Sequence, residues 1–431
     1  MKDLSRRLKK RFFPLLYLRQ IEKDERSLGK ERDAKRLLRF KQTLQWAGRT
    51  VPYYRETFKV IGFDPGRVRC LEDLSKIPVL TKSSIQADPT RFISEKVPES
   101  KRQSQGTTGS SGRPLQVWMT KEEELYSHAL VLYGFLKSGA RPGMRLAIVR
   151  NASPALKGVK KVNRDIFQWY VLDLKNELDE ILKQLNELKP EILYSYPSWL
   201  SLLSRHLLDK GFRIYKPSFV FTHGEGLTPE VRSLIRSALG CPVRNSYGST
   251  EFYRMAYECG EEKLHILETP YVLETVMPQV LVPGDHGEEI IVTSLYHRAM
   301  PFIRYRLGDR IVKREGRCGC GAEGPIIEEV TGRSDDFLVL PSERRVSARA
   351  VNLLDDIPGI LEYQIIQKEK HRLEVRVRPG SEFDETIEQR IKEKILEGCG
   401  GEPVEVNVLM VDQILRLPNG KLSAVISEIR P

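Results

Sequence analysis

The first part of the chain carries apolar residues at helical spacing. The positions that would form one buried helix face are Leu37, Leu38, Leu44 and Trp46. The pattern ends at Val51-Pro52-Tyr53-Tyr54, because a proline disfavours helical backbone in the residue before it and lacks an amide donor. The spacing predicts a helical start over residues 1 to about 60.

Short apolar runs alternate with helical stretches through the middle of the chain. These runs are Leu146-Ala147-Ile148-Val149, Ile192-Leu193 and Phe219-Val220-Phe221. Runs of this length separated by helices are typical of parallel strands with crossover helices, so they predict an α/β fold with doubly wound sheets. From about Gly287 the pattern turns to β character, with Ile290-Ile291-Val292, which predicts a β subdomain over about residues 270–330.

The pattern changes again after Gly332. Alternating apolar positions at Leu373, Val375 and Val377 indicate a strand, and isoleucines repeat every four residues from Ile387 to Ile395. Strand, helix and strand within about 60 residues predict a small α+β domain. We place the boundary near Asp335, which gives a large domain over residues 1–334 and a small one over 335–431.

Length and composition fit a soluble protein of more than one domain. The chain has 431 residues, 40% hydrophobic and 30% charged. It contains neither an apolar stretch of membrane-spanning length nor a secretory signal, so we expect a cytoplasmic protein.

The net charge of +12 favours anionic partners, among which ATP, coenzyme A, nucleic acid and an acidic membrane surface all qualify. The basic run from Arg6 to Arg11 is followed by Phe12, Phe13, Leu15 and Leu16. Such a segment either packs on its own domain, which we favour, or makes peripheral contact with a membrane.

A glycine- and serine-rich run reads Thr108-Gly109-Ser110-Ser111-Gly112-Arg113. Its hydroxyls and glycine amides can close around phosphate oxygens, with Arg113 as the cationic partner. A flexible turn between two strands has the same composition, so this run alone does not decide between the two readings.

A second run reads Tyr247-Gly248-Ser249-Thr250-Glu251. Tyr247 could stack on adenine and Thr250 could bond an α-phosphate. Glu251 could ligate Mg²⁺, a hard ion that prefers oxygen. Taken alone, the run also suits an ordinary turn at the end of a strand.

Three further residues have polar chemistry that suits a nucleotide. Asp309, in Arg-Leu-Gly-Asp, can accept hydrogen bonds from both ribose hydroxyls, and Arg333 is a cation that could reach the same ligand. Lys421 follows Asn419-Gly420 in a predicted turn near the C-terminus.

In this order, the runs resemble the phosphate loop, adenine and magnesium loop, ribose aspartate, hinge and mobile lysine of the acyl-adenylate-forming superfamily. More narrowly, the chain is similar to the phenylacetate–coenzyme A ligase family, including its relatives from capsular polysaccharide clusters. The resemblance implies that a small C-terminal domain swings about a hinge at Asp335. It makes Lys421, Thr250 and Glu251 the catalytic residues, with Lys421 contacting the carboxylate and the α-phosphate.

The same resemblance assigns the neighbouring turns. Gly224 and Glu225 are expected near the adenine, and Tyr196 and Ser198 beside the carboxylate pocket. His223 either borders the substrate pocket or is a satisfied structural histidine.

The implied activity is ATP- and Mg²⁺-dependent activation of a carboxylic acid, aryl or similarly hydrophobic, followed by transfer to coenzyme A. We expect no nucleic-acid partner, and the family suggests a homodimer. Three features depart from the family: Arg113 stands where lysine is usual, the stretch after Asp336 lacks a glycine-containing run, and the run after Lys421 lacks the downstream arginine of many relatives. Transfer to another acceptor, such as a carrier thiol, an amine or a hydroxyl, therefore stays open, as does a non-catalytic basic binding module.

Cys259, His265, Cys318 and Cys320 form two clusters of soft or borderline ligands. They suit a closed tetrahedral Zn²⁺ site that ties two β segments together, and some members of the resembled family carry zinc with this layout. The alternative is four side chains without a metal. The other cysteines, which we expect to be small buried residues, are Cys70, Cys241 and Cys399.

Overall fold

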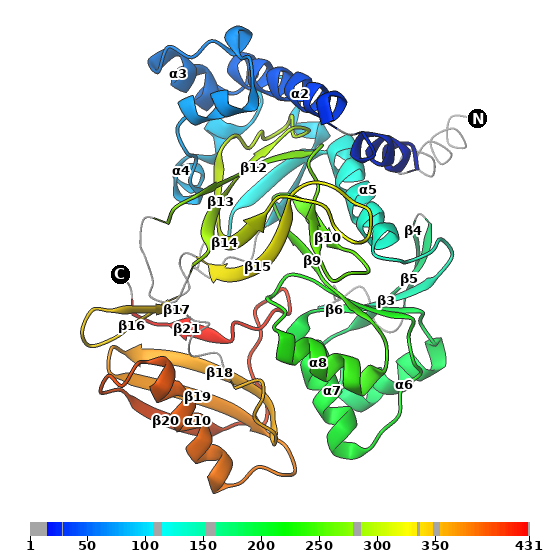
Figure 1. Ribbon diagram of the computed structural model, residues 1–431, viewed down its shortest axis with the longest axis vertical. Helices are drawn as coiled ribbons and strands as arrows, with labels where there is room; N and C mark the ends of the chain where they lie inside the picture. Colours follow the sequence, from blue (N-terminus) through cyan, green and yellow to red (C-terminus); the bar gives the residue numbers. More distant parts are fainter. Residues whose placement is uncertain are drawn as a thin grey trace.

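The computed structural model describes residues 15–27, 29–106, 114–151, 160–164, 166–278, 286–333, 337–347 and 354–429. Figure 1 shows N-terminal helices α2, α3 and α4 at the top and the seven-stranded sheet in the middle. Below it, the six-stranded sheet with helices α6, α7 and α8 lies at lower right, beside the smaller C-terminal sheet with helix α10 at lower left. Over the described ranges, no helix combines the length and apolar composition needed to span a bilayer.

From residue 15 on, the N-terminal part of the structure is helical, and the first 14 residues of the predicted helical start lie outside the described residues. After a helix over residues 15–25, the elements are α2 (Gly29–Thr50), α3 (Pro52–Val60), η1 (Pro65–Arg67), η2 (Leu71–Lys76), α4 (Lys82–Ala87), η3 (Pro89–Phe92) and η4 (Glu99–Lys101). The predicted face of α2 was partly wrong: Phe40, Leu44 and Ala47 are buried, whereas Leu38 is 57% exposed. At 100° per residue, Leu38 lies 200° around the helix from Phe40 and so on the opposite side.

A six-stranded sheet with strand order β4-β5-β3-β6-β7-β8 carries the next elements, and all neighbours except β4 and β5 are parallel. Its strands are β3 (Arg145–Arg150), β4 (Lys160–Arg164), β5 (Phe167–Asp173), β6 (Ile192–Ser195), β7 (Phe219–Thr222) and β8 (Val243–Arg244). Its helices are α5 (Lys121–Lys137), α6 (Leu178–Leu188), α7 (Pro197–Lys210) and α8 (Pro229–Leu239).

Both faces of this sheet are buried, because successive residues of a strand point to opposite faces. On β3, Leu146 and Ile148 belong to the core that includes α5, whereas Ala147 and Val149 belong to the core formed with α6, α7 and α8. The predicted α/β fold with a doubly wound sheet is thereby confirmed.

An antiparallel sheet of seven strands lies on the other side of α5, with strand order β12-β13-β14-β15-β11-β10-β9. Its strands are β9 (Ser246–Ser249), β10 (Tyr253–Glu258), β11 (Leu264–Ile266), β12 (Tyr271–Val276), β13 (Glu288–Ser294), β14 (Tyr305–Arg314) and β15 (Ile326–Arg333). The sheet therefore begins earlier in the chain than the predicted β subdomain. A separate hairpin of β1 (Arg102–Gly106) and β2 (Gln116–Thr120) flanks the predicted phosphate run.

The C-terminal residues form their own sheet and core. The elements are β16 (Phe337–Val339), β17 (Arg345–Ser347), β18 (Ile360–Glu369), β19 (Arg372–Pro379), α10 (Glu385–Gly398), β20 (Glu405–Met410) and β21 (Val425–Ser427). Helix α10 begins after Asp384, whose side chain accepts from the Ile387 amide, and its isoleucines face the sheet core. The boundary near Asp335 lies outside the described residues, so the hinge and the mobility of this unit stay predictions.

Candidate active site

The predicted turn around Lys421 reaches the edge of the parallel sheet. In residues 417–421, hereafter the lysine turn, the Leu417 amide donates to the Lys421 carbonyl at 2.9 Å. Asn151 follows β3 and donates to the Pro418 carbonyl at 2.9 Å, and the Tyr196 hydroxyl after β6 donates to the Asn419 carbonyl at 2.9 Å.

Strands β3 and β6 are adjacent, yet the chain visits β5 between them, on the far side of β3. The carboxyl ends of β3 and β6 thus form the topological switch point, where open α/β sheets bind ligands. The fold therefore brings the lysine turn to the place on this sheet where a ligand is expected.

Glu225 joins the lysine turn to helix α7. It follows β7 and Gly224, which has φ +77°, a backbone conformation that glycine adopts without strain. One carboxylate oxygen accepts from the Leu422 amide at 2.8 Å, and the other accepts from the Ser198 amide at the start of α7 at 2.9 Å. We call Asn151, Tyr196, Ser198 and Glu225 the α/β wall.

The Lys421 side chain lies against Gly224. A Cβ atom at Gly224 would sit 2.8 Å from Cε and 3.2 Å from Nζ of the lysine, so the glycine leaves the room that this side chain occupies. Burial lowers the pKa of the Lys421 ammonium, and Arg333 lowers it further, whereas Glu225 and Asp309 oppose the shift.

A buried ion pair supports the lysine turn from within the C-terminal unit. Arg416 pairs with Glu362 of β18, and the side chains are 11% and 6% exposed. Its Nη1 also donates to the Ser198 hydroxyl at 2.8 Å and to the Gly420 carbonyl at 3.3 Å. Arg416 thus links the turn to both units of the protein.

The opposite side of the cleft is built from the antiparallel sheet. Tyr247 of β9 donates its hydroxyl to Asp309 at 2.7 Å, and Arg333 lies 3.5 Å from the same carboxylate. Asp309 on β14 is the strand partner of Arg333 on β15, which explains why residues distant in sequence meet. Glu251 is 7% exposed and accepts from the Tyr305 hydroxyl at 3.1 Å. We call Tyr247, Glu251, Asp309 and Arg333 the β wall.

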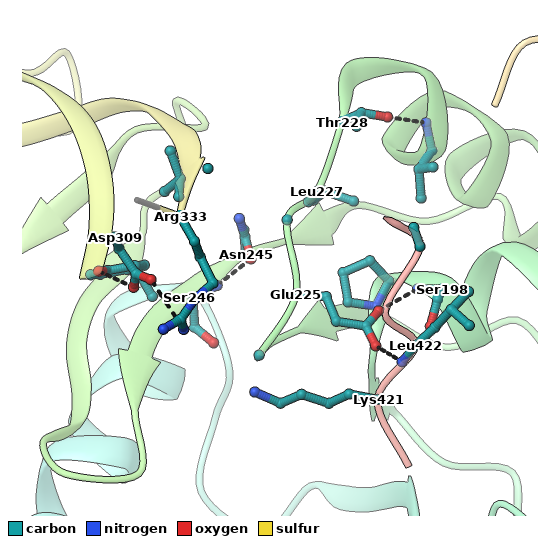
Figure 2. A pocket seen from close by; sticks show the side chains of 18 of the residues that line it. Ser198, Glu225, Leu227, Thr228, Asn245, Ser246, Asp309, Arg333, Lys421 and Leu422 are labelled. Atoms are coloured by element: carbon teal, nitrogen blue, oxygen red, sulfur yellow. Dashed lines mark hydrogen bonds and ion pairs between the residues drawn. The ribbon is translucent and has the colours of Figure 1, made fainter. Parts of the chain in front are cut away.

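Ser198 and Glu225 of the α/β wall and the four residues of the β wall line a cleft of about 1000 Å³, which Lys421, Gly248 and Thr250 also line. Figure 2 shows Lys421 extending from its turn into the space between the two walls, with Glu225 on one side and Asp309 and Arg333 on the other. The phosphate run from Thr108 to Arg113 lies outside the described residues.

The His223 ring packs, tilted, against two tyrosines, with ring centroids 4.2 Å from Tyr194 and 4.8 Å from Tyr196. Burial, together with the Lys421 and Arg254 cations, lowers the pKa of His223 to about 3, so the imidazole is neutral at physiological pH. Its Nδ1 has no hydrogen-bond partner in the described residues.

The predicted zinc ligands come together at one end of the antiparallel sheet. Cys259, His265, Cys318 and Cys320 offer donor atoms that all lie within 4.8 Å of one another. Tetrahedral zinc with Zn–S near 2.3 Å requires S···S near 3.8 Å and S···N near 3.6 Å. The Cys259–Cys318 sulfurs are 3.7 Å apart, and Cys320 Sγ lies 3.4 Å from His265 Nε2, so these residues fit the ion.

Three site residues were missed from the sequence. Asn151 had a usable signal, because it follows an apolar strand at the ligand-binding edge of a parallel sheet. Arg416 and Glu362 had none, since 54 residues separate the partners of their ion pair. Among the remaining cysteines, Cys241 and Cys399 are buried as expected, whereas Cys70 is exposed at the start of η2.

Comparisons with known proteins agree with this architecture. The family model of the CapK C-terminal domain matches residues 340–428. A phenylacetate–coenzyme A ligase of Thermus thermophilus is 26% identical over 422 residues, covering 90% of this chain and 94% of the relative. Protein CapK of Staphylococcus aureus is 26% identical over 410 residues, covering 91% and 88%.

Among solved structures, 2-hydroxyisobutyryl-CoA ligase in its postadenylation state has a TM-score of 0.76 at 20% identity, covering 94% of each chain, which shows a shared fold. The resemblance drawn from the sequence is confirmed: the chain is similar to phenylacetate–coenzyme A ligases and to CapK, and it has the acyl-adenylate-forming fold.

Proposed function

We propose that the protein uses ATP and Mg²⁺ to activate a carboxylic acid with an aryl or similarly hydrophobic body, and then transfers the acyl group to coenzyme A. The observation that carries the proposal is Lys421, a half-buried ammonium that a C-terminal turn inserts between the two walls of the cleft. The relatives named phenylacetate–coenzyme A ligase support the same activity.

Each wall would serve one part of the first reaction. The acid's carboxylate attacks the α-phosphorus, the bond to the β-phosphate oxygen breaks, and pyrophosphate leaves. Negative charge grows on the α-phosphate oxygens, and the Lys421 ammonium would stabilise it. On the β wall, Asp309 would accept hydrogen bonds from the ribose, with Arg333 beside it and Tyr247 holding the carboxylate in place.

Glu251 fits the predicted magnesium site. Its carboxylate is buried, accepts a hydrogen bond from the neutral Tyr305 hydroxyl, and forms no ion pair among the described residues. Bound there, Mg²⁺ would offset phosphate charge and orient the leaving group.

The second reaction requires the lysine turn to withdraw so that a thiol can reach the acyl-adenylate. The contacts between this segment and the α/β wall are individual hydrogen bonds: Asn151 and Tyr196 donate to main-chain carbonyls of the turn, and Glu225 accepts from the Leu422 amide just after it. A swinging domain can break and remake such bonds. A hinge at Asp335, the phosphate run from Thr108 to Arg113, and a homodimeric cytoplasmic enzyme stay predictions.

The cluster of Cys259, His265, Cys318 and Cys320 would hold a structural Zn²⁺, because four protein ligands leave no open position for substrate. It would fasten the loop between β14 and β15 to the hairpin of β10 and β11. Elemental analysis of protein purified without chelator should give one equivalent of zinc. Less than about a tenth of an equivalent would exclude this role.

The activity is tested by ATP–pyrophosphate exchange over a panel of aryl, acyl and amino acids, each with and without coenzyme A. We expect exchange that depends on the acid, and thioester that forms only with coenzyme A. Exchange without thioester would point to another acceptor, the alternative raised by the stretch after Asp336. The absence of exchange with every acid of the panel, in protein shown to be folded and to bind ATP, would overturn the proposal.

A further inference from the structure

Arg254 is a buried cation beside the cleft. It lies on β10, 3% exposed, as the strand partner of the cleft-lining Gly248. No carboxylate of the described residues forms an ion pair with it, and its Nη1 has no hydrogen-bond partner there. Burying an unpaired charge is costly, so such an arginine is expected to meet an anion.

The surroundings of Arg254 are shaped for a guanidinium. Its Cζ lies 5.1 Å from the centroid of the Phe135 ring on α5. The preceding residue is Gly134, where an added Cβ would lie only 2.8 Å from Nη1 and 3.2 Å from Cζ. Glycine in a helix interior is destabilising relative to alanine, and here its absent side chain provides the space that the guanidinium fills.

A row of side chains connects Arg254 to Lys421. The Arg254 guanidinium lies beside the Tyr194 hydroxyl. The Tyr194 ring packs, tilted, against His223 with ring centroids 4.2 Å apart, and His223 packs in the same way against Tyr196 at 4.8 Å. Tyr196 Cε1 and Lys421 Nζ lie 3.3 Å and 3.2 Å from the position of a Cβ at Gly224. An ammonium therefore stands at one end of an aromatic row and a guanidinium at the other.

Two polar atoms along this row lack partners in the described residues, namely Nη1 of Arg254 and Nδ1 of His223. The two residues both contact Tyr194, which lies between them. His223 is neutral, and so is Tyr194, because burial raises the pKa of its hydroxyl. Neither neighbour supplies the negative charge that would balance Arg254.

We propose that Arg254 recognises a second anionic group on the acid, at the end remote from the carboxylate that is activated beside Lys421. The substrate class is then a hydrophobic, best an aromatic, acid that bears a further carboxylate or an equivalent anion. The aromatic row would contact its body, and the guanidinium would pair with the second charge. This inference rests on the proposed function, since it names the substrate of the same site.

The test compares phenylacetate with para-carboxyphenylacetate in wild-type protein. Binding is measured by calorimetry without ATP, and kcat/KM by ATP–pyrophosphate exchange. We expect the second carboxylate to raise kcat/KM by about 100-fold, the size of effect seen when one partner of a buried charge pair is removed. Equal values for the two acids, or a preference for phenylacetate, would overturn the proposal.

Variants then assign the preference to Arg254. Arg254→Met should reduce the ratio between the two acids to near one, and Arg254→Lys should restore part of it. Gly134→Ala keeps the charge but displaces the guanidinium, so it should lower the same ratio. Arg141→Met, at an exposed arginine just beyond α5, is the matched control and should leave the ratio unchanged.

The outcomes separate a specificity role from a structural one. If Arg254→Met lowers the binding and kcat/KM of both acids equally and also lowers Tm, the arginine is structural and the proposal is wrong. Exchange supported by phenylacetate alone would keep the proposed activity and overturn the second-anion site. If para-carboxyphenylacetate binds in an Arg254-dependent way but no acid supports exchange, the second-anion site is kept and the proposed activity is overturned.

Discussion

The two walls of the cleft are organised differently around the lysine turn. The α/β wall makes hydrogen bonds to the main chain of the lysine turn and of Leu422 after it. Asn151 donates to the Pro418 carbonyl, Tyr196 donates to the Asn419 carbonyl, and Glu225 accepts from the Leu422 amide. The polar side chains of the β wall instead bond within the antiparallel sheet, as Tyr247 and Arg333 do with Asp309.

This difference separates the binding of the lysine turn to the α/β wall, hereafter docking, from the adenylation reaction. Because main-chain groups make the docking contacts, the turn should bind to the α/β wall whatever side chain stands at position 421. The β wall, which fixes its carboxylates in place before any ligand arrives, is suited to recognition. Substitutions on the two walls should therefore affect different steps.

The largest effect is expected from Lys421→Ala. Removing the ammonium should lower the rate of acyl-adenylate formation by about 100- to 1000-fold, the range for loss of one group that stabilises transition-state charge. Nucleotide affinity and thioester formation from supplied acyl-adenylate should change little, because the docking contacts remain. Single-turnover assays of the two reactions measure both. An equal loss in both would mean that the variant disturbs docking and would contradict the separation.

A smaller effect is expected on the β wall from Asp309→Asn. The amide can still accept from Tyr247, but it no longer offers a charged acceptor to the ribose, so affinity for AMP should fall by about 10- to 100-fold. Tyr247→Phe is the matched variant: it removes the hydroxyl that donates to the Asp309 carboxylate and should lower affinity for AMP by only a few-fold. Calorimetry with AMP checks both, and unchanged affinity in Asp309→Asn would remove this carboxylate from the nucleotide site.

A smaller effect again is expected on the α/β wall from Ser198→Ala. It removes the hydroxyl that accepts from Arg416 Nη1 at 2.8 Å, but keeps the Ser198 amide bond to Glu225 and the pair of Arg416 with Glu362. Adenylation should slow by about 5- to 10-fold, the range for loss of one ordinary hydrogen bond, because Arg416 keeps its ion pair; KM for the acid should be unchanged. The exposed Ser381 of the C-terminal unit cannot serve as a control for this variant, because it is hydrogen-bonded to Asp209.

A matched control for Ser198→Ala is Ser83→Ala on α4, an exposed serine whose hydroxyl bonds the Thr81 hydroxyl at the start of its own helix. It should leave both half-reactions unchanged. A rise in KM for the acid in Ser198→Ala, without slower adenylation, would instead support the pocket position that the family resemblance gives Ser198.

The sequence predicted the sheets because local patterns carry them. Alternation at Leu373, Val375 and Val377 and the four-residue spacing from Ile387 to Ile395 follow directly from which side chains face the core. The side chains of the site were identified through ordered motifs, so Asp309 and Arg333 were named without knowledge that β14 and β15 pair them.

What escaped prediction depends on packing between distant segments. Leu38 is exposed because neighbouring elements cover the side of α2 that bears Phe40 and Leu44, which spacing alone did not settle. In the sequence Arg254 is an ordinary strand arginine, and its burial became visible only when the structure placed α5, with Gly134, against it. Likewise, Arg416 meets Glu362 only through the fold of the C-terminal unit.

The finest comparison of the walls is the pH dependence of adenylation. Burial lowers the pKa of Lys421 below its ordinary value near 10.5, and the reaction needs the charged form, so the rate should fall as pH rises through that lowered pKa. Glu225 on the α/β wall raises this pKa and Arg333 on the β wall lowers it. Glu225→Gln should therefore move the inflection to lower pH and Arg333→Met should move it to higher pH, each by up to about one unit. Single-turnover rates across pH measure the shifts, and Lys421→Arg, whose guanidinium stays charged, should abolish the inflection. An inflection that persists in Lys421→Arg would belong to another group.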